Sequence, residues 1–138
     1  MKTLWIWLLL ALVALAAHAS PTVSEKNEGG AFSVTITFDA TTTPSKLIRP
    51  KGLCDATFVR AGGETVTLYQ TTASTATGGA SVATFSATTT RPTQITYGQP
   101  SLYAVSNGAT AGGTLTIHCS PTQVSGGGRG GDPDVDDD

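Results

Sequence analysis

Outside the first 19 residues the chain contains one histidine, His118. Acyl transfer by a Ser-His-Asp or Cys-His arrangement would have to use this imidazole as its general base. His118 precedes Cys119 in a stretch that alternates like a strand, and the alternation places it on the side away from the apolar residues. No Gly-x-Ser-x-Gly turn surrounds any serine. We therefore expect a surface histidine, no catalytic residues and a protein that is not an enzyme.

The carboxylates are too scattered to predict catalysis. Glycoside hydrolysis needs two carboxyl groups facing each other across a cleft. The acidic residues before the C-terminal segment all lie in a polar leader or in or beside expected turns: Glu25, Glu28, Asp39, Asp55 and Glu64. A zinc site needs clustered His and Cys, which the sequence lacks. The Gly-rich segment 126–131 lacks the strand, lysine and helix of a phosphate-binding loop, so no cofactor is expected.

Three aspartates alternate near the end of the chain, at Asp132, Asp134 and Asp136. Their spacing is that of the start of an EF-hand loop, but the glycine at the sixth position and the glutamate at the twelfth are missing. The sequence therefore predicts no metal site there beyond weak contacts with millimolar Ca²⁺. A solvated acidic tail is the preferred interpretation.

The two cysteines, Cys54 and Cys119, predict one disulfide if the chain is exported. Each is in phase with the apolar residues of its own strand, so both side chains are expected to point into the core. The bridge closes a loop with 64 intervening residues. The chain-entropy model gives such a loop about 4 kcal/mol of stabilisation.

The best candidates for ligand binding are three tyrosines expected at the surface, Tyr69, Tyr97 and Tyr103. Tyr69 and Tyr103 are out of phase with apolar neighbours on their strands, whereas Tyr97 is in phase with Ile95. An amphipathic phenol ring suits a wet interface, and rings gathered on one face would form a platform for a sugar. The alternative is three tyrosines at the edge of the core with hydrated hydroxyl groups.

Alternating apolar residues predict seven short strands and no amphipathic helix. The clearest is AFSVTITF, in which Phe32, Val34, Ile36 and Phe38 share one face. In SVATFSA, Val82 and Phe85 differ in parity, which a β-bulge or burial on both sides would explain. The expected strands lie within 31–38, 54–61, 64–70, 81–87, 92–97, 101–106 and 114–119.

Seven short strands separated by turn signals favour an all-β fold, a small antiparallel β-sandwich of immunoglobulin-like or jelly-roll-like architecture, over a small barrel. The spacing of Cys54 and Cys119 resembles that of immunoglobulin domains. The resemblance extends to the architecture only, because no Trp lies between the two cysteines and Ile117 stands where that family has a tyrosine.

The N-terminal 19 residues have the three-part layout of a secretory signal peptide. Lys2 is followed by 14 apolar residues and by Ala17-His18-Ala19, a pattern suited to cleavage. An uncleaved N-terminal anchor is the alternative. The expected organisation is a signal peptide (1–19), a flexible leader (20–30), a β-sandwich domain (31–124) and a Gly-rich linker with an acidic disordered tail (125–138). Such a protein would be secreted, extracellular or periplasmic.

Charge excludes nucleic acid as a partner. Residues 20–124 contain six Lys/Arg and five Asp/Glu, whereas residues 125–138 contain one Arg and five Asp. The 23 threonines after residue 19 would place uncharged hydroxyl groups on outward strand faces. We therefore expect a secreted structural or adhesive protein of a surface, matrix or virion, whose partners are copies of itself, another surface protein or a glycan. The alternative is a small carbohydrate- or protein-binding module that uses the three tyrosines.

Overall fold

The computed structural model describes residues 20–121. The expected signal peptide, the Gly-rich linker, the acidic tail and the weak Ca²⁺ contacts at Asp132, Asp134 and Asp136 lie outside these residues. Within them, no helix is long and apolar enough to cross a membrane.

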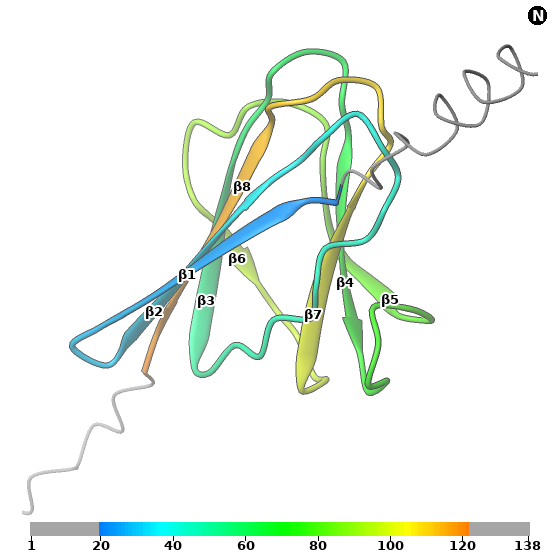
Figure 1. Ribbon diagram of the computed structural model, residues 1–138. Coiled ribbons are helices and arrows are strands. Elements are labelled where there is room, and N and C mark those ends of the chain that lie inside the picture. Colours follow the sequence, from blue (N-terminus) through cyan, green and yellow to red (C-terminus); the bar gives the residue numbers. More distant parts are fainter. Residues whose placement is uncertain (1–19, 122–138) are drawn as a thin grey trace, which may run out of the picture.

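The described chain folds into eight antiparallel strands in two sheets, which confirms the all-β, sandwich-like fold (Figure 1). The larger sheet has the order β1-β2-β8-β3-β6, and the smaller one has the order β5-β4-β7. The strands are β1 (Thr22–Glu28), β2 (Ala31–Thr37), β3 (Leu53–Val59), β4 (Val66–Thr71), β5 (Ala80–Phe85), β6 (Thr93–Ile95), β7 (Ser101–Ser106) and β8 (Thr114–Ser120).

Seven of these strands, β2 to β8, coincide with the seven that the alternation predicts. The sequence predicted an irregularity in the strand within 81–87, which is β5, and the structure shows a β-bulge there. Leu68 is paired with Ala83 and Tyr69 with Ser81, so Val82 is the extra residue. The bulge reverses the parity of the strand, and this is why Val82 and Phe85 fall out of phase.

The remaining strand, β1, was not predicted, and it corrects the expectation of a flexible leader at residues 20–30. β1 pairs along its whole length with β2, and the two form a hairpin through Gly29 and Gly30. These glycines have φ of 56° and 84°, the left-handed conformation that a two-residue hairpin turn requires and that glycine adopts most easily. β1 is polar because it is an edge strand, and its charged residues protect that edge from pairing with another sheet.

The core lies between the inner faces of the two sheets. Phe58 of the larger sheet contacts Phe85 of the smaller one, with ring centroids 6.1 Å apart. Side chains from both sheets and from the β2–β3 connection fill the remaining space. The buried apolar residues are Val34, Ile36, Phe38, Ile48, Cys54, Ala56, Phe58, Val66, Leu68, Phe85, Ile95, Leu102, Ala104, Leu115, Ile117 and Cys119. Because every second residue of β2, β3 and β8 points inward, the residues between them form the opposite, solvent-facing surface.

Candidate functional site

The solvent-facing side of the larger sheet carries a continuous array of hydroxyl groups. The register places Thr22, Thr37 and Thr114 side by side on β1, β2 and β8. A second row crosses β1, β2, β8 and β3 through Ser24, Thr35, Thr116 and Thr57. We call these seven residues the hydroxyl face.

The hydroxyl face is uncharged and its side chains are half-buried or exposed. The hydroxyl oxygens of Thr35 and Thr116 lie 3.3 Å apart and share a hydrogen bond. Cross-strand Thr–Thr pairs of this kind stabilise a sheet by about 0.2–1 kcal/mol each. Each threonine also presents a methyl group, so the surface combines apolar contact area with donors and acceptors. It suits contact with an extended surface better than capture of a small molecule.

One end of this surface carries a different row of side chains, which the sequence did not reveal as neighbours. Ser33, His118 and Asp55 lie directly opposite one another on β2, β8 and β3. The row has the residue types of a catalytic triad, but the structure contains no hydrogen bond between His118 and either neighbour. His118 is exposed, as expected from its parity. Only the strand order could have identified this row, because the three residues are far apart in sequence.

The disulfide joins Cys54 and Cys119, as predicted, and both side chains point into the core. The two residues are directly opposite on β3 and β8, with Cα atoms 4.0 Å apart. The bridge therefore lies within one sheet, whereas the disulfide of immunoglobulin domains connects two sheets. It ties together two of the strands that form the hydroxyl face. A disulfide also indicates a non-reducing environment, which is the environment of exported proteins.

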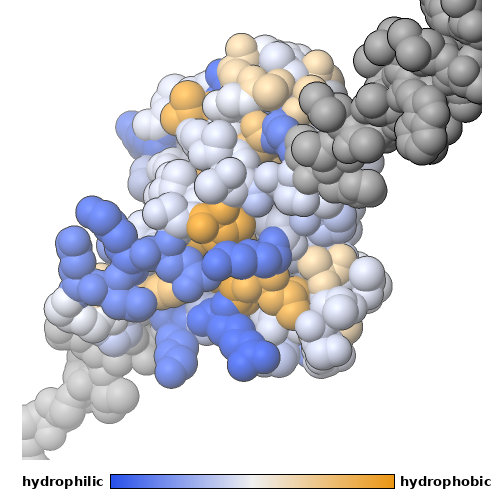
Figure 2. All heavy atoms as spheres, viewed as in Figure 1, coloured by the Kyte–Doolittle hydropathy of each residue, from blue (hydrophilic) through white to orange (hydrophobic). Residues whose placement is uncertain are grey.

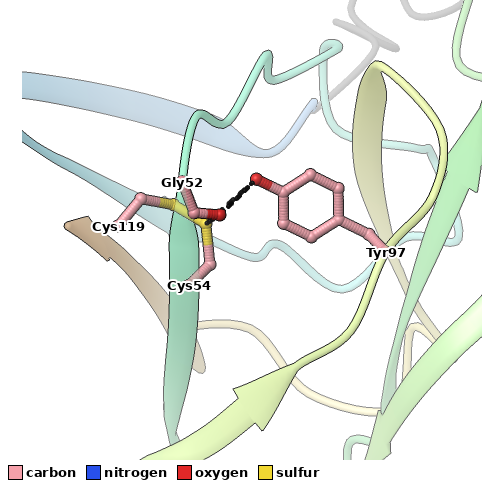
Figure 3. The surroundings of a disulfide bond; sticks show 4 residues. All are labelled: Gly52, Cys54, Tyr97 and Cys119. Carbon is pink, nitrogen blue, oxygen red and sulfur yellow. Dashed lines mark hydrogen bonds between the residues drawn. A yellow bond between two sulfur atoms is a disulfide. The ribbon is translucent and has the colours of Figure 1, made fainter. Parts of the chain in front are cut away.

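Tyr97 lies beside this disulfide (Figure 3). Its hydroxyl group donates a 2.8 Å hydrogen bond to the carbonyl oxygen of Gly52 and is 3.6 Å from Sγ of Cys54. Burial raises the pKa of the Tyr97 hydroxyl above its usual value. Gly52 has φ of 87°, and a Cβ at this position would lie 2.2 Å from the carbonyl oxygen of Ser120. Tyr97 therefore holds a turn that only glycine can make.

Tyr69 and Tyr103 meet on the solvent-facing side of the smaller sheet. They are directly opposite on β4 and β7, and their rings stack with centroids 5.2 Å apart and an interplanar angle of 14°. Tyr103 is only 5 % exposed, which corrects the expectation that it lies at the surface. Its hydroxyl group accepts a hydrogen bond from the backbone N–H of Gly79, at 3.2 Å. Tyr69 is half-buried.

The three tyrosines therefore do not form one platform. Tyr69 and Tyr103 belong to the smaller sheet, and Tyr97 follows β6 of the larger one. The ring of Tyr103 is covered by its neighbours, because a Cβ at Gly79 would lie only 3.1 Å from Tyr103 Cε1. Parity along a strand predicted an outward direction correctly, but it could not show that Tyr69 and the chain at Gly79 cover this side chain.

A pocket of about 410 Å³ opens where the β1–β2 hairpin meets the chain that leads into β3. We call it the cationic pocket, because two of its lining residues are Arg49 and Lys51. The residues that line it are Asn27, Gly30, Phe32, Arg49, Lys51, Gly52 and Pro121. Sequence patterns did not predict this pocket, because it depends on contact between segments of different strands and loops.

Glu64 is a fully buried carboxylate with a structural role. It accepts hydrogen bonds from the backbone N–H groups of Ala61 and Gly62. Burial raises the pKa of Glu64, but the hydrogen bonds from Ala61, from its own backbone, from Gly62 and from the Thr110 side chain outweigh burial and hold the pKa below its usual value. Its ionised form therefore fixes the turn before β4 against the loop before β8.

Among residues 20–121, His, Cys, Asp and Glu form no group of three or more that could hold a metal ion. Comparisons with protein-family models, with curated proteins and with solved structures found no match.

Proposed function

We propose that this protein is a secreted, non-enzymatic structural or adhesive domain that associates with further copies of itself through the hydroxyl face. The observation that carries the proposal is the alignment of seven Thr and Ser side chains in two rows across four neighbouring strands. Backbone pairing fixes the positions of these side chains, so little conformational entropy remains to be lost on contact.

The chemistry of the face supports self-association. Each hydroxyl group both donates and accepts a hydrogen bond, so a row of threonines is complementary to an identical row. A twofold contact requires such self-complementarity. The absence of charge from the two rows removes the repulsion that would oppose contact between identical surfaces. Charged residues at the border, Lys26 on β1 and Asp55 on β3, can set the orientation of the partner.

The Cys54–Cys119 bridge supports the same proposal because it joins two inner strands of the larger sheet, β8 and β3, near one end of their ladder. It crosslinks β8, which contributes Thr114 and Thr116, to β3, which contributes Thr57. A covalent link between these strands limits sliding and local opening of the sheet. A structural component outside the cell benefits from such a link because it must last without repair.

The test compares two substitutions that each introduce a positive charge. Thr116→Lys places a cation in the middle of the hydroxyl face, and in a twofold contact it would bring like charges together. Thr84→Lys is the matched control, because Thr84 is an exposed residue on the solvent-facing side of the smaller sheet. Sedimentation equilibrium should show association of the parent chain and of Thr84→Lys, with affinity at least tenfold weaker for Thr116→Lys.

Thermal unfolding of each variant must accompany this measurement, so that loss of the fold is not mistaken for loss of the contact. Thr57→Lys is a second substitution that places a positive charge on the hydroxyl face, on β3 instead of β8. Equal affinities for Thr116→Lys, Thr57→Lys and Thr84→Lys in folded proteins would contradict the proposal.

A further inference from the structure

The cationic pocket has an excess of positive charge that the described residues do not neutralise. Glu25, on the same side of β1 as the pocket residue Asn27, pairs with Lys46 at 3.5 Å, and Glu28, on the opposite side of β1, pairs with Lys26 at 3.7 Å. Within residues 20–121, neither Arg49 nor Lys51 forms an ion pair. The pocket therefore contains two cations for which this part of the chain provides no acidic partner.

The surface around the pocket combines charge with apolar area. Figure 2 shows strongly hydrophilic side chains gathered over β1 and beside it, with hydrophobic atoms visible between them. Phe32 and Pro121 give the pocket an apolar wall, and the backbone turns at Gly30 and Gly52 border it. Such a site suits a short chain segment that alternates carboxylates with small apolar residues.

The protein contains one segment of this composition. Residues 132–138 read DPDVDDD, with five aspartates, one proline and one valine. The opposite charges of this segment and of the pocket are the first argument that the two belong together. Residues 122–131 between them contain a single charged residue, Arg129.

The path of the chain provides the second argument. Pro121, the last described residue, is itself part of the wall of the pocket. Asp132 follows eleven residues later, and a stretch of that length spans at most about 40 Å. Two groups joined by so short a connection meet at an effective concentration in the millimolar range. The chain's own C-terminal segment therefore has an advantage over any acidic partner that is present at micromolar concentration.

We propose that the cationic pocket is a carboxylate-binding site whose occupant is the acidic segment 132–138 of the same chain. Arg49 offers a planar fork that can bind one carboxylate through two hydrogen bonds, and Lys51 offers a point charge to another. The site is independent of the hydroxyl face, because the pocket-lining residues Asn27 and Phe32 lie on the opposite side of the β1–β2 ladder. A bound segment occupies the pocket and therefore competes with other acidic ligands.

The test compares the full secreted chain with a variant of equal length in which the five aspartates of residues 132–138 are replaced by asparagine. Backbone amide NMR signals of Gly30, Lys51 and Gly52 are recorded at about 10 mM and about 500 mM salt. Screening is weak at the lower salt and strong at the higher. We expect these signals to differ between the two proteins at low salt and to coincide at high salt. Identical spectra at low salt would overturn the proposal.

Two further variants show which cations are involved. Arg49→Gln combined with Lys51→Gln should abolish the spectral difference that the aspartates cause. Lys46→Gln is the matched control, because it removes an exposed cation that already has an acidic partner, Glu25. An equal loss of the difference in the Lys46→Gln protein would overturn the proposal and indicate only a diffuse charge effect.

Dilution distinguishes binding of segment 132–138 to the pocket of its own chain from binding to the pocket of a second copy. Within one chain, the low-salt difference should stay constant when the protein is diluted tenfold. A difference that fades on dilution would show that the segment binds a neighbouring copy, and this would contradict the assignment of the occupant. Loss of the hydroxyl-face contact in Thr116→Lys should leave the spectral difference unchanged.

Discussion

Cys54 and Cys119 face each other directly across two neighbouring antiparallel strands, with Cα atoms 4.0 Å apart. The bond thus fixes the pairing of β3 and β8 inside one sheet, while the hydroxyl oxygen of Tyr97 lies 3.6 Å from Sγ of Cys54. Residues 65 positions apart in sequence are thus joined on the core side of two strands whose outer side belongs to the surface on which the proposed function depends.

Replacing both cysteines by alanine should lower the stability of the domain sharply. The loop that opens corresponds to about 4 kcal/mol in the chain-entropy model, a large share of the roughly 5–15 kcal/mol typical of a domain. At about 4–8 °C per kcal/mol for a domain of this size, the melting temperature should fall by at least about 15 °C. Calorimetry under non-reducing conditions checks this, and Cys54→Ser should behave similarly. Equal melting of parent and double variant would show that the bridge does not stabilise the fold.

Gly79→Ala should destabilise the smaller sheet. The added Cβ would lie 2.6 Å from the carbonyl oxygen of Gln70 and 3.1 Å from Tyr103 Cε1. Overpacking of this kind costs about 1–3 kcal/mol. Denaturant unfolding followed by tyrosine fluorescence measures the change. Gly98→Ala is the control, because nothing lies within 4 Å of a Cβ at that position, and it should change the free energy of unfolding little. The same loss in both variants would contradict the close packing of Tyr103 against Gly79.

Glu64→Gln should remove a pH-dependent part of the stability. The pKa of Glu64 in the folded chain is below its usual value, so the ionised carboxylate stabilises the fold at pH values above the unfolded pKa of about 4.3. This contribution is lost as the pH falls through the folded pKa. The melting temperature of Glu64→Gln should therefore be several degrees below that of the parent at pH 7, and the difference should shrink in acid.

Glu25→Gln is the matched control for Glu64→Gln, because Glu25 forms an exposed ion pair with Lys46. Exposed pairs contribute little to stability, so the melting temperature of Glu25→Gln should stay close to that of the parent at pH 7. A gap between the parent and Glu64→Gln that remains constant from pH 7 to pH 3 would show that the charge of Glu64 is not what stabilises the turn.

The sequence predicted most of the fold because the inward-facing residues of β2, β3 and β8 alternate cleanly. It missed β1, where Val23 is the only apolar residue. An edge strand with both sides near solvent has no reason to alternate, and its structure comes from backbone pairing with β2. The turn at Gly29 and Gly30 was interpreted as flexibility, although the same two residues also suit a tight hairpin.

The candidate sites were harder to predict because each depends on strand order. Parity gave the outward direction of Tyr69, Tyr103 and His118, but it could not give their neighbours. The rows of the hydroxyl face and the Ser33–His118–Asp55 row exist only because β8 lies between β2 and β3. Nothing in the local sequence encodes that order. The disulfide came closest, since Cys54 and Cys119 had to meet and each was already in phase with its strand.

The most direct test of the proposed function is an isotope-filtered NOE measurement on a mixture of ¹³C-labelled and unlabelled protein, at concentrations where sedimentation shows association. This experiment detects only contacts between different copies. The hydroxyl-face proposal predicts intermolecular contacts from the methyl groups of Thr35, Thr114 and Thr116. Contacts confined to the smaller sheet, for example at Tyr69 or Thr84, or a chain that stays monomeric at every concentration, would contradict it.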